Sequence, residues 1–400
     1  MRLFSGWHGR QKVPRGVDYK RGAKEYLNKV DKDTYYYHFV KPYVGGPDFS
    51  SYLQEMRDFL ALFEILDLAP RSRVLEVGCG PGWICERLAM FGHQVCGIDL
   101  SPGMIEIARQ RLAAIKYGPF EHTLPEVDYR VADAERFQLG RTFDAAVYFS
   151  TLHHIEDAPS SLRCAFEHLT EHGKLFIVEG VKPPEGSVWD QENLRLMRDL
   201  ATLESPFEPD HLAELVTRAG FTTIRQFRML NKLCELGFEE MEQAAVAAEL
   251  AAPLTKNALL ARKPIPGLHY SDNPGRLLAE FSSPETALRA GRGEPIVLRV
   301  NVRNSGDTLW LRIRPKRGWV RLRARLRDEN GGLLRELFPA VMLNHDMMPD
   351  ERFEVTMSLD NNLAHGRYLL EVDMVNEGIT WFSDQGNQGS RPLRLPLTIG

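Results

Sequence analysis

Hydrophobic and polar positions alternate with two different periods along residues 51–263. Short runs that are apolar at almost every position predict strands buried on both faces, and the longer stretches between them repeat apolar residues at the spacing of a helix face. Strands that alternate with helices are typical of a mostly parallel sheet covered on both sides, so an α/β domain is expected here. The predicted strands are Arg73–Val77, Gln94–Asp99, Val127–Ala132, Phe143–Phe149, Lys174–Glu179, Thr222–Leu230 and Ala258–Arg262, and the predicted helices are Ser51–Leu66, Trp83–Phe91, Pro102–Ala114, Pro159–Leu169 and Pro209–Ala219.

The pattern changes after Lys263. Residues 264–284 are rich in proline and glycine and suit a linker between domains. Residues 285–400 show short strands with alternating apolar positions, and turn signals at 304–307 and 330–332 predict hairpins. An all-β, immunoglobulin-like sandwich is therefore expected in this region. Its predicted strands are Pro295–Arg303, Trp319–Arg327, Arg352–Leu359 and Arg367–Val375.

Residues 1–50 precede the α/β domain. The first half is basic but lacks the apolar core of a signal peptide, so a mobile or loosely docked arm is expected, and its charge could attract an anionic membrane surface. Thr34–Pro47 holds four tyrosines and His38, a composition that suits either a lid over a cofactor or an aromatic cap on the core. The chain is thus divided into an arm and cofactor lid (1–50), an α/β domain (51–263), a linker (264–284) and a β-sandwich domain (285–400).

Composition narrows the class of protein. The 400 residues are 43% hydrophobic and 26% charged, as in ordinary globular proteins, and a net charge of −4 gives no reason to expect a nucleic-acid partner. The five cysteines form no CxxC pair, which argues against a disulfide framework or a zinc site and fits a reducing compartment. No apolar run approaches the ~20 residues that span a bilayer. A cytoplasmic protein without a metal site is expected.

Three glycines follow a strand-ending acid in VLEVGCGPGW, residues 74–83. Gly78, Gly80 and Gly82 would let the first strand-to-helix turn bend tightly and let a ligand approach the backbone, at the sheet edge where ligands bind. Turns that bind pyrophosphate have the spacing G-x-G-x-x-G, whereas this spacing is G-x-G-x-G and Glu76 precedes it. A carboxylate there would repel a pyrophosphate and suits a cationic ligand. A nicotinamide-dependent dehydrogenase is therefore the weaker alternative.

This turn resembles the first motif of the class I S-adenosylmethionine-dependent methyltransferases, and later segments of residues 50–263 resemble the family's other motifs in the right order. In GIDLSPGMIEIARQR, Asp99 stands where the family's acid holds both ribose hydroxyls, and in VADAERF, Asp133 stands where its acid receives the adenine amino group. The resemblance continues through FDAAVYFSTLHHIED, LTEHGKLFIVEG, LAELVTRAGFTTIRQF and NALLARK. It implies a Rossmann-like methyltransferase fold, with a seven-stranded sheet whose last strand is antiparallel, and S-adenosylmethionine as the cofactor.

Each implied cofactor residue also has a structural alternative. Asp99 suits a diol, because an ionised carboxylate only accepts hydrogen bonds, but it could instead cap the next helix, a role better suited to Ser101. Glu76 could face the cofactor's ammonium group or bond the amides of the glycine turn. Asp133 could be a solvated loop acid, and Met104 could be core rather than a contact of the adenine. The implied cofactor-binding residues are Glu76, Gly78, Cys79, Gly80, Gly82, Asp99, Leu100, Met104, Asp133, Ala134 and Ser150.

His153 and His154, after the fourth strand, are the candidate catalytic residues. In the family this loop faces the sulfonium, and histidine is the side chain best suited to take a proton from a hydroxyl acceptor near neutral pH. Bracing of the loop by one or both histidines is the structural alternative, and Glu179 is a weaker candidate base. Pro183–Phe207 is expected to help form the acceptor pocket. Its large side chains, to which no role is assigned, are Trp189, Arg195, Arg198 and Phe207.

Val320–Arg327 alternates apolar residues with four arginines, so a strand would place all four on one face. This face is expected to be solvated and paired with acids such as Glu354, Glu371 and Asp373; the alternative is a surface for an anionic glycan, a lipid-linked phosphate or a membrane. The segments NSGDTLW and HGRYLLEVDMVNEGITWFSDQG resemble β-sandwich modules of bacterial surface-polysaccharide proteins. The aromatic residues that could stack on sugars, or simply belong to the core, are Trp310, Trp319, Trp381 and Phe382.

Together these features predict an S-adenosylmethionine-dependent methyltransferase that O-methylates a sugar or glycan precursor in polysaccharide biosynthesis. A quinone, phenol or polyketide acceptor is the competing expectation, and a non-catalytic scaffold that binds the cofactor is a third. The expected partners are a small-molecule or glycan acceptor, with peripheral contact to a membrane or a lipid-linked glycan. The oligomeric state is left open.

Overall fold

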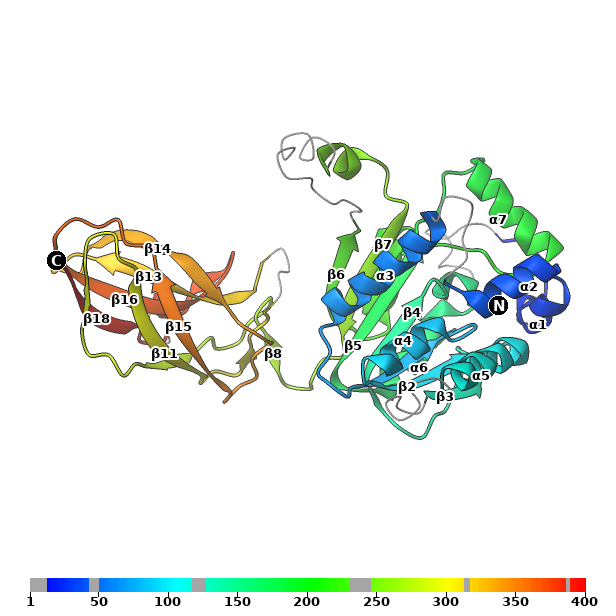
Figure 1. Cartoon of the computed structure of the whole chain (residues 1–400), viewed down its shortest axis with the longest axis horizontal. Helices are drawn as coiled ribbons and strands as arrows, with labels where there is room; N and C mark the ends of the chain where they lie inside the picture. The colour runs from blue at the N-terminus through cyan, green and yellow to red at the C-terminus, as the bar shows by residue number, and fades with distance from the viewer. Residues whose placement is uncertain (1–12, 43–49, 117–126, 230–245, 313–316, 386–388) are drawn as a thin grey trace. The chain divides into compact units, whose positions relative to one another are not determined.

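The computed structural model describes residues 13–42, 50–116, 127–229, 246–312, 317–385 and 389–400 (Figure 1). The chain divides into two compact units, Met1–Pro264 and Ile265–Gly400. Among the helices of the described ranges, none has both the length and the apolarity needed to cross a bilayer. Cys79, Cys85, Cys96 and Cys164 are free thiols, and Cys234 lies outside the described residues.

A seven-stranded sheet with the strand order β3-β2-β1-β4-β5-β7-β6 forms the first unit. Strands β1 to β5 pair in parallel, and β7 runs antiparallel between β5 and β6, as expected. The strand order reverses at β1, which pairs with β2 on one side and β4 on the other, so a ligand crevice is expected at the carboxyl ends of these strands. The strands are β1 (Arg73–Val77), β2 (Gln94–Asp99), β3 (Val127–Val131), β4 (Phe143–Phe149), β5 (Leu169–Gly180), β6 (Thr222–Arg228) and β7 (Lys256–Arg262).

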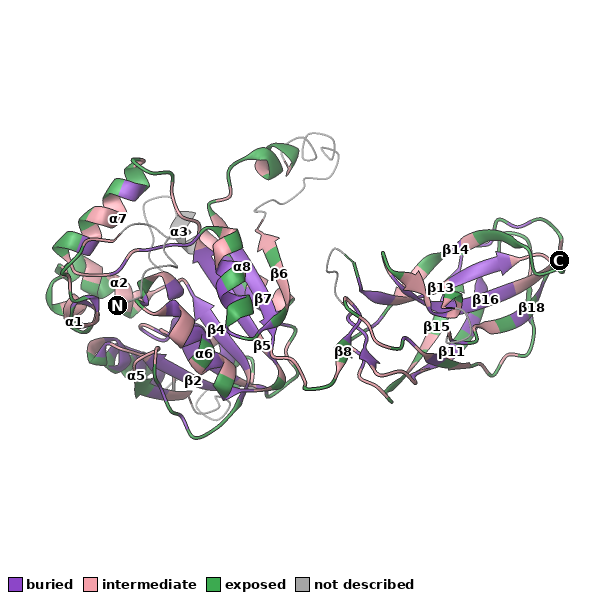
Figure 2. Ribbon diagram, turned by 180° about the vertical axis from the view of Figure 1, so that it is seen from behind, coloured by how far each residue is buried: buried purple, intermediate pink, exposed green. Residues whose placement is uncertain are grey.

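Helices cover both faces of this sheet (Figures 1 and 2). Leu75 and Val77 of β1 join the core cluster on one face, and Val74 joins the cluster on the other. Because both faces are covered, both sets of alternating side chains are buried, which explains the near-continuous apolar strands. The first face is covered by α6 (Ala158–His168) and α8 (Pro209–Arg218), and the second by α3 (Ser50–Leu66), α4 (Trp83–Met90) and α5 (Pro102–Lys116).

Residues 13–42 are docked on the first unit, so the expectation of a mobile or loosely docked arm is wrong for them. Tyr19 packs with Met197 and Leu203 in a small buried cluster. A Cβ at Gly22 would lie 1.9 Å from the carbonyl oxygen of Ala201, so the close contact requires glycine. The elements in contact are α1 (Tyr19–Glu25), η2 (Tyr26–Asn28), α2 (Lys32–Val40) and α7 (Val188–Asp199) with the segment that follows it.

Two sheets that share one hydrophobic core form the second unit, which confirms the all-β expectation. One has the order β10-β18-β16-β13-β14, with β17 beside β16, and the other has the order β15-β11-β9. The hairpin predicted at 330–332 joins the antiparallel strands β13 and β14. The hairpin predicted at 304–307 is wrong, because β11 pairs with β9 and β15 while β12 pairs with β8. The strands are β8 (His269–Tyr270), β9 (Ala279–Ser282), β10 (Leu288–Ala290), β11 (Ile296–Asn304), β12 (Thr308–Leu309), β13 (Val320–Arg327), β14 (Leu333–Met342), β15 (Arg352–Leu359), β16 (Gly366–Asn376), β17 (Thr380–Trp381) and β18 (Leu393–Ile399).

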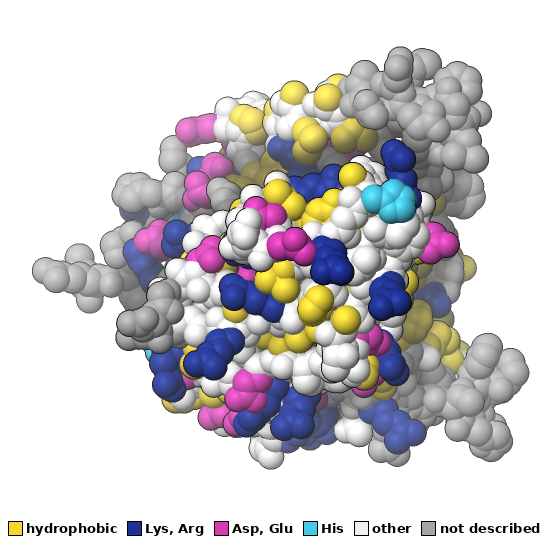
Figure 3. Space-filling model, turned by 90° about the vertical axis from the view of Figure 1, so that its left-hand side faces the viewer, with side chains coloured by type: hydrophobic (Ala, Val, Ile, Leu, Met, Phe, Trp, Pro, Cys, Tyr) yellow, Lys and Arg dark blue, Asp and Glu magenta, His cyan; other side chains and the backbone are white. Residues whose placement is uncertain are grey.

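The arginines of β13 are paired with acids on neighbouring strands. Arg327 donates to Glu371 of β16 at 2.8 Å, and Arg394 of β18 donates to the other oxygen of the same carboxylate at 2.9 Å. Of the three acids expected to pair with the arginines, Glu371 forms ion pairs with Arg325 and Arg327. Glu354 lies on β15, in the other sheet. Burial raises the pKa of Asp373 to about 6. In the face drawn in Figure 3, basic and acidic side chains are interspersed. The ion pairs of the β13 arginines favour the paired face over a free cationic surface.

The aromatic residues of the second unit are mostly packed rather than open. Trp310 and Phe382 are fully buried and contact each other edge to face, with ring centroids 5.1 Å apart. The Arg321 guanidinium lies 4.6 Å from the ring of Trp319, and that of Arg325 lies 3.4 Å from the ring of Trp381. Burial or a stacked guanidinium thus occupies the surfaces that a sugar ring would need.

Candidate active site

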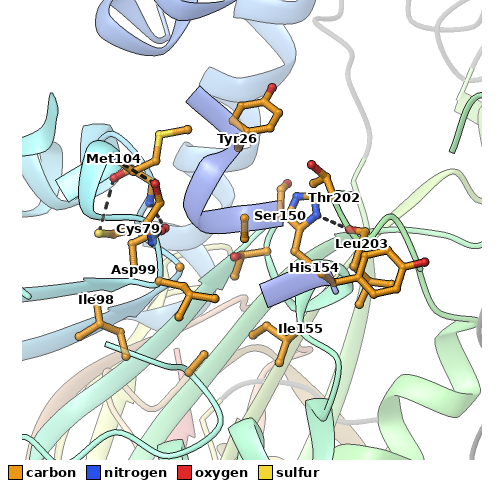
Figure 4. Close-up of a pocket in the computed structure, with 18 of the residues that line it drawn as sticks. Tyr26, Cys79, Ile98, Asp99, Met104, Ser150, His154, Ile155, Thr202 and Leu203 are labelled. Carbon is orange, nitrogen blue, oxygen red and sulfur yellow. Dashed lines mark hydrogen bonds between the residues drawn. The ribbon is translucent and has the colours of Figure 1, made fainter. Parts of the chain in front are cut away.

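A cavity of about 320 Å³ opens at the carboxyl ends of β1, β2 and β4 and is covered by the docked arm (Figure 4). Figure 4 shows Cys79, Asp99 and Met104 on one side of this pocket and His154 and Leu203 on the other. The structure therefore brings together segments that are distant in the sequence. Of the predicted cofactor-binding residues, those that line the cavity are Glu76, Gly78, Cys79, Gly80, Asp99, Leu100, Met104, Asp133, Ala134 and Ser150.

The three glycines of the turn have different structural roles. Gly78 has a φ of +70°, and a Cβ there would lie 2.0 Å from Oγ1 of Thr151. Gly80 has a φ of +51° and lines the cavity, with open space where a Cβ would stand. Gly82 is absent from the lining, and a Cβ there would lie 2.5 Å from the hydroxyl of Tyr129. The first two glycines shape the cavity, whereas Gly82 permits the packing of the turn against β3.

Asp99 organises the glycine turn. Its carboxylate accepts one hydrogen bond from the amide of Gly80 at 2.9 Å and another from the amide of Ser101 at 2.8 Å. Burial raises the pKa of Asp99, although these amide bonds oppose the shift. Ser101 caps α5 by accepting a bond from the amide of Met104 at 3.4 Å. Since a carboxylate oxygen has two lone pairs, Asp99 can hold the turn and still accept hydrogen bonds from a diol.

Glu76 is buried beside the turn, with 2% of its surface exposed. Its carboxyl group contacts the Cys85 thiol, with 2.8 Å between oxygen and sulfur. Burial raises the pKa of Glu76 to about 8. The amides of the glycine turn were candidate partners of Glu76. The amide of Gly80 donates to Asp99 and not to Glu76. The position of Glu76 in the cavity lining suits a cationic group.

Asp133 ties the docked arm to the cavity. Its carboxylate accepts bonds from Lys20 of α1 at 2.9 Å and from Arg136 at 3.1 Å, and it also accepts a bond from the amide of Glu135. The side chain is only 15% exposed, so the alternative of a solvated loop acid is wrong. Lys20 was not singled out in the sequence. The arm contains several lysines, and nothing in the sequence distinguishes the one that pairs with Asp133 and Glu135.

His153 is the first of two adjacent histidines and acts as a brace. Its Nδ1 lies 2.5 Å from a carboxylate oxygen of Glu179, which is fully buried and also accepts bonds from the amides of Thr151 and Leu152. Burial alone would lower the pKa of His153, but the Glu179 carboxylate raises it to about 10. His153 is therefore charged at neutral pH and does not line the cavity. Neither His153 nor Glu179 is placed to act as a base.

His154 has the opposite properties. Its Nδ1 lies 2.6 Å from the carbonyl oxygen of Leu203, and since a carbonyl only accepts, this nitrogen carries the hydrogen. The lone pair of the neutral ring is then on Nε2. Burial and the neighbouring His153 charge lower the pKa of His154. A neutral histidine that lines the cavity has the protonation state required of a general base.

Glu204 lies between the two imidazoles, 3.5 Å from Nε2 of His153 and 3.5 Å from Nδ1 of His154. The nitrogen and oxygen atoms of these three side chains lie within 4.8 Å of one another. Two histidines and a carboxylate at this spacing could hold a metal ion. Glu204 is within ion-pair distance of both rings, so in this structure the three side chains form a charged network beside Nδ1 of His154.

The acceptor side of the cavity was only partly predicted. The lid segment does contribute His38, but Tyr35 and Tyr36 are exposed on the outside of α2 and Tyr43 lies outside the described residues. The inserted segment also contributes, but through residues that were not singled out. Trp189 is 73% exposed, Phe207 is in the core, and Arg195 and Arg198 are bonded within α7. The lining residues that were missed in the N-terminal arm and in the inserted segment are Tyr19, Lys20, Ala23, Tyr26, Lys41, Leu196, Leu200, Thr202, Leu203 and Glu204.

Residues 49–226 match the family model described as a methyltransferase domain. The matched range contains every residue of the predicted cofactor and catalytic set. This match agrees with the prediction of a methyltransferase domain in this part of the chain. The C-terminal unit lies outside the match.

Curated relatives resemble parts of this chain. The ubiquinone biosynthesis O-methyltransferase of Xanthomonas oryzae pv. oryzae is 38% identical over 114 residues, which are 28% of this chain and 44% of the relative. Phosphoethanolamine N-methyltransferase 3 of Arabidopsis thaliana is 29% identical over 174 residues, which are 42% of this chain and 33% of the relative. The chain thus spans less than half the length of these relatives.

Solved structures are similar to part of this chain at lower identity. Phosphoethanolamine N-methyltransferase 2 of Haemonchus contortus, in complex with S-adenosyl-L-methionine, is 20% identical with a TM-score of 0.44, and the match covers 63% of this chain and 62% of that one. Magnesium protoporphyrin IX methyltransferase of Synechocystis is 16% identical with a TM-score of 0.41, covering 63% and 100%.

Proposed function

We propose that this chain, whose residues 49–226 form a methyltransferase domain, transfers a methyl group from S-adenosylmethionine to a hydroxyl group. The observation that carries the proposal is the state of His154. It is a neutral histidine whose Nδ1 hydrogen is bonded to Leu203, so Nε2 holds a lone pair, and it lines the same cavity as Asp99. A hydroxyl of high pKa requires such a base, whereas an amine acceptor does not.

The residues on the Asp99 side of the cavity fit the cofactor. Gly80 leaves open space beside the backbone, and the acids Glu76, Asp99 and Asp133 line the cavity. We assign the ribose hydroxyls to Asp99, the adenine to the loop of Asp133 and the ammonium group to Glu76. The bound cofactor supplies a methyl group on a positively charged sulfur, and that bond breaks with its electron pair remaining on sulfur. A diphosphate-containing cofactor fits poorly because it would face these acids.

On the other side, His154 takes the hydroxyl proton at Nε2 while the acceptor oxygen forms its bond to the methyl carbon. Glu204, 3.5 Å from Nδ1, stabilises the imidazolium that forms. His153 and Glu179 hold the loop in place through their ion pair. The arm covers the cavity and excludes water, which helps an in-line displacement that depends on alignment.

The acceptor class is proposed from weaker observations. A sugar or glycan precursor, and with it a role in polysaccharide biosynthesis, rests on the resemblance of the C-terminal sandwich to immunoglobulin-like modules of surface-polysaccharide proteins. Its packed tryptophans and paired arginines give that acceptor little added support. A quinone or phenol acceptor is favoured by the similarity to a ubiquinone biosynthesis O-methyltransferase. Transfer of a labelled methyl group to any acceptor would exclude the alternative of a non-catalytic scaffold.

Replacing Asp99 with alanine tests the cofactor site. We expect the affinity for S-adenosylhomocysteine, measured by calorimetry, to fall by about 1.5–3 kcal/mol, because charged hydrogen bonds to the ribose are lost. The matched control is Asp128→Ala, which removes an acid of β3 that pairs with Arg130 and Arg141 away from the cavity. Equal affinities of Asp99→Ala and the control would refute the ribose assignment.

Glu76 should couple cofactor binding to pH. With a pKa of about 8, the free protein holds a proton on Glu76 at pH 7, and an ammonium group beside it favours the ionised form. Binding of S-adenosylhomocysteine should therefore release up to one proton at pH 7, and affinity should fall as pH is lowered below 8. Calorimetry in two buffers of different ionisation enthalpy measures the release, which Glu76→Gln should abolish. The same release from Glu76→Gln would show that another group titrates.

A further inference from the structure

Two polar atoms in the cavity lining are buried and have no hydrogen-bond partner among the described residues: Nε2 of His38 and Oγ1 of Thr202. Leaving such an atom unpaired costs about 1–3 kcal/mol, so unpaired atoms that line a cavity point to a ligand. They come from α2 and from the segment after α7, which both line this cavity. Figure 4 shows Thr202 beside His154, across the pocket from Asp99.

His38 is held in place by aromatic side chains. The rings of Tyr26 and Tyr37 contact it edge on, each with a centroid distance of 5.5 Å. Burial and the charge of Lys41 lower the pKa of His38 to about 4, so the ring is neutral at pH 7. Tyr26 also lines the cavity, and the nearby Glu204 adds to the effect of burial in raising the pKa of its phenol. Tyr26 and His38 thus form an aromatic part of the cavity lining.

The charges around the cavity disfavour an anionic acceptor. Lys20 is paired with Asp133 at 2.9 Å and with Glu135 at 2.5 Å, and Lys41 is paired with Glu55 at 3.1 Å. Within the described part of the lining there is no arginine. A phosphate or carboxylate would lose its hydration without gaining an unpaired cation, which is unfavourable. The acid Glu204 beside His154 also lines the cavity, together with three leucines, Leu196, Leu200 and Leu203.

We propose that His38 and Thr202 bind the acceptor, and that they select an uncharged ring with a second hydroxyl group beside the one that is methylated. The inference rests on the proposed function, since His154 serves as the base for the first hydroxyl. The second hydroxyl bonds to Nε2 of His38 and Oγ1 of Thr202, and the ring lies between Tyr26 and the leucines. A catechol and a sugar diol share this chemistry, and the experiment distinguishes them.

The test uses the full chain with S-adenosylmethionine labelled on the methyl group. The acceptor probes are 4-methylcatechol, a methyl galactopyranoside and O-phosphoethanolamine. We expect methyl transfer to one of the two neutral diols and none to O-phosphoethanolamine. Transfer to the catechol identifies a phenolic acceptor, and transfer to the glycoside identifies a sugar acceptor. Transfer to O-phosphoethanolamine alone, or to no ring although calorimetry shows bound cofactor, would overturn the acceptor proposal. Absence of cofactor binding would instead overturn the proposed function.

The role of His38 is tested separately by binding, in protein saturated with S-adenosylhomocysteine. His38→Leu should weaken the binding of the methylated diol about tenfold, the value of one hydrogen bond. The same substitution should leave unchanged the binding of an otherwise identical ring that lacks the second hydroxyl. Tyr36→Leu, on the exposed side of α2, is the matched control and should change neither affinity. Equal losses for both rings in His38→Leu would show that His38 only shapes the lid and would overturn the assignment.

Discussion

Replacing His154 with glutamine is expected to lower kcat by about 100- to 10,000-fold, the usual contribution of a general base. Glutamine can still donate to the carbonyl of Leu203 but has no nitrogen that can take the acceptor proton. The affinity for S-adenosylhomocysteine should stay within about twofold, because Asp99 and the glycine turn lie on the other side of the pocket. Single-turnover kinetics with labelled cofactor, together with calorimetry, measure the two quantities.

The pH profile provides a second readout of the same role. A base works in its unprotonated form, so kcat of the native protein should fall as pH drops through the pKa of His154, which lies below 6.5. The His154→Gln variant should lose this acid limb. His168→Gln is the matched control, because His168 also bonds a carbonyl through Nδ1, at 2.8 Å from Cys164, but lies outside the cavity. A nearly native kcat with the acid limb intact in His154→Gln would show that this histidine only braces the loop.

Replacing Glu179 with glutamine should lower the free energy of unfolding by about 3–5 kcal/mol, because it removes the nearer of the two carboxylates that balance the buried charge of His153 and leaves only the contact with Glu204 at 3.5 Å. The carboxylate is fully buried and holds three donors, so a neutral amide cannot replace it. Urea unfolding of the native protein and the variant measures the difference. Glu171→Gln, at an exposed position of β5, is the control and should change the stability little.

The stabilisation by the His153–Glu179 pair should decrease both at low pH and at high pH. His153 has a raised pKa, so its contribution is complete below its unfolded pKa of 6.5 and is lost as pH rises towards about 10. Glu179 has a lowered pKa, so its contribution is complete above its unfolded pKa of 4.5 and is lost at lower pH. The difference between the native protein and Glu179→Gln should therefore be largest between pH 4.5 and 6.5. A difference that does not vary with pH would show that the pair is not ionised.

The fold of the first unit could be read from the sequence because its strands are buried on both faces and each turn carries local signals. The predicted bounds of β1, β2 and β4 agree with the structure residue by residue. The second unit was harder to predict. Leu333–Met342 forms β14 with mostly exposed side chains, so it lacks the alternating pattern that revealed β13.

The cofactor side of the cavity was also accessible to sequence reasoning, since its members follow the ends of successive strands. The acceptor side was not, because it is formed between α1, α2 and the segment after α7, whose contacts connect residues far apart in the chain. The residues next to Lys20 and Thr202 in the sequence form no motif that would predict a ligand-binding site. The two histidines are adjacent and chemically identical, so nothing local distinguishes them.

The sequence by itself determined the sheet, the glycine turn and the acids around it, because strand periodicity and local turn geometry depend on neighbouring residues. Only the tertiary structure decided which histidine can accept a proton. The carboxylate of Glu179 keeps His153 charged in spite of burial, whereas burial and the charge of His153 keep His154 neutral. The carbonyl of Leu203, 49 residues further along the chain, fixes the hydrogen of that neutral ring on Nδ1 and so leaves the lone pair on Nε2. A pKa depends on the charges and burial that surround a group in space, and these exist only once the chain has folded.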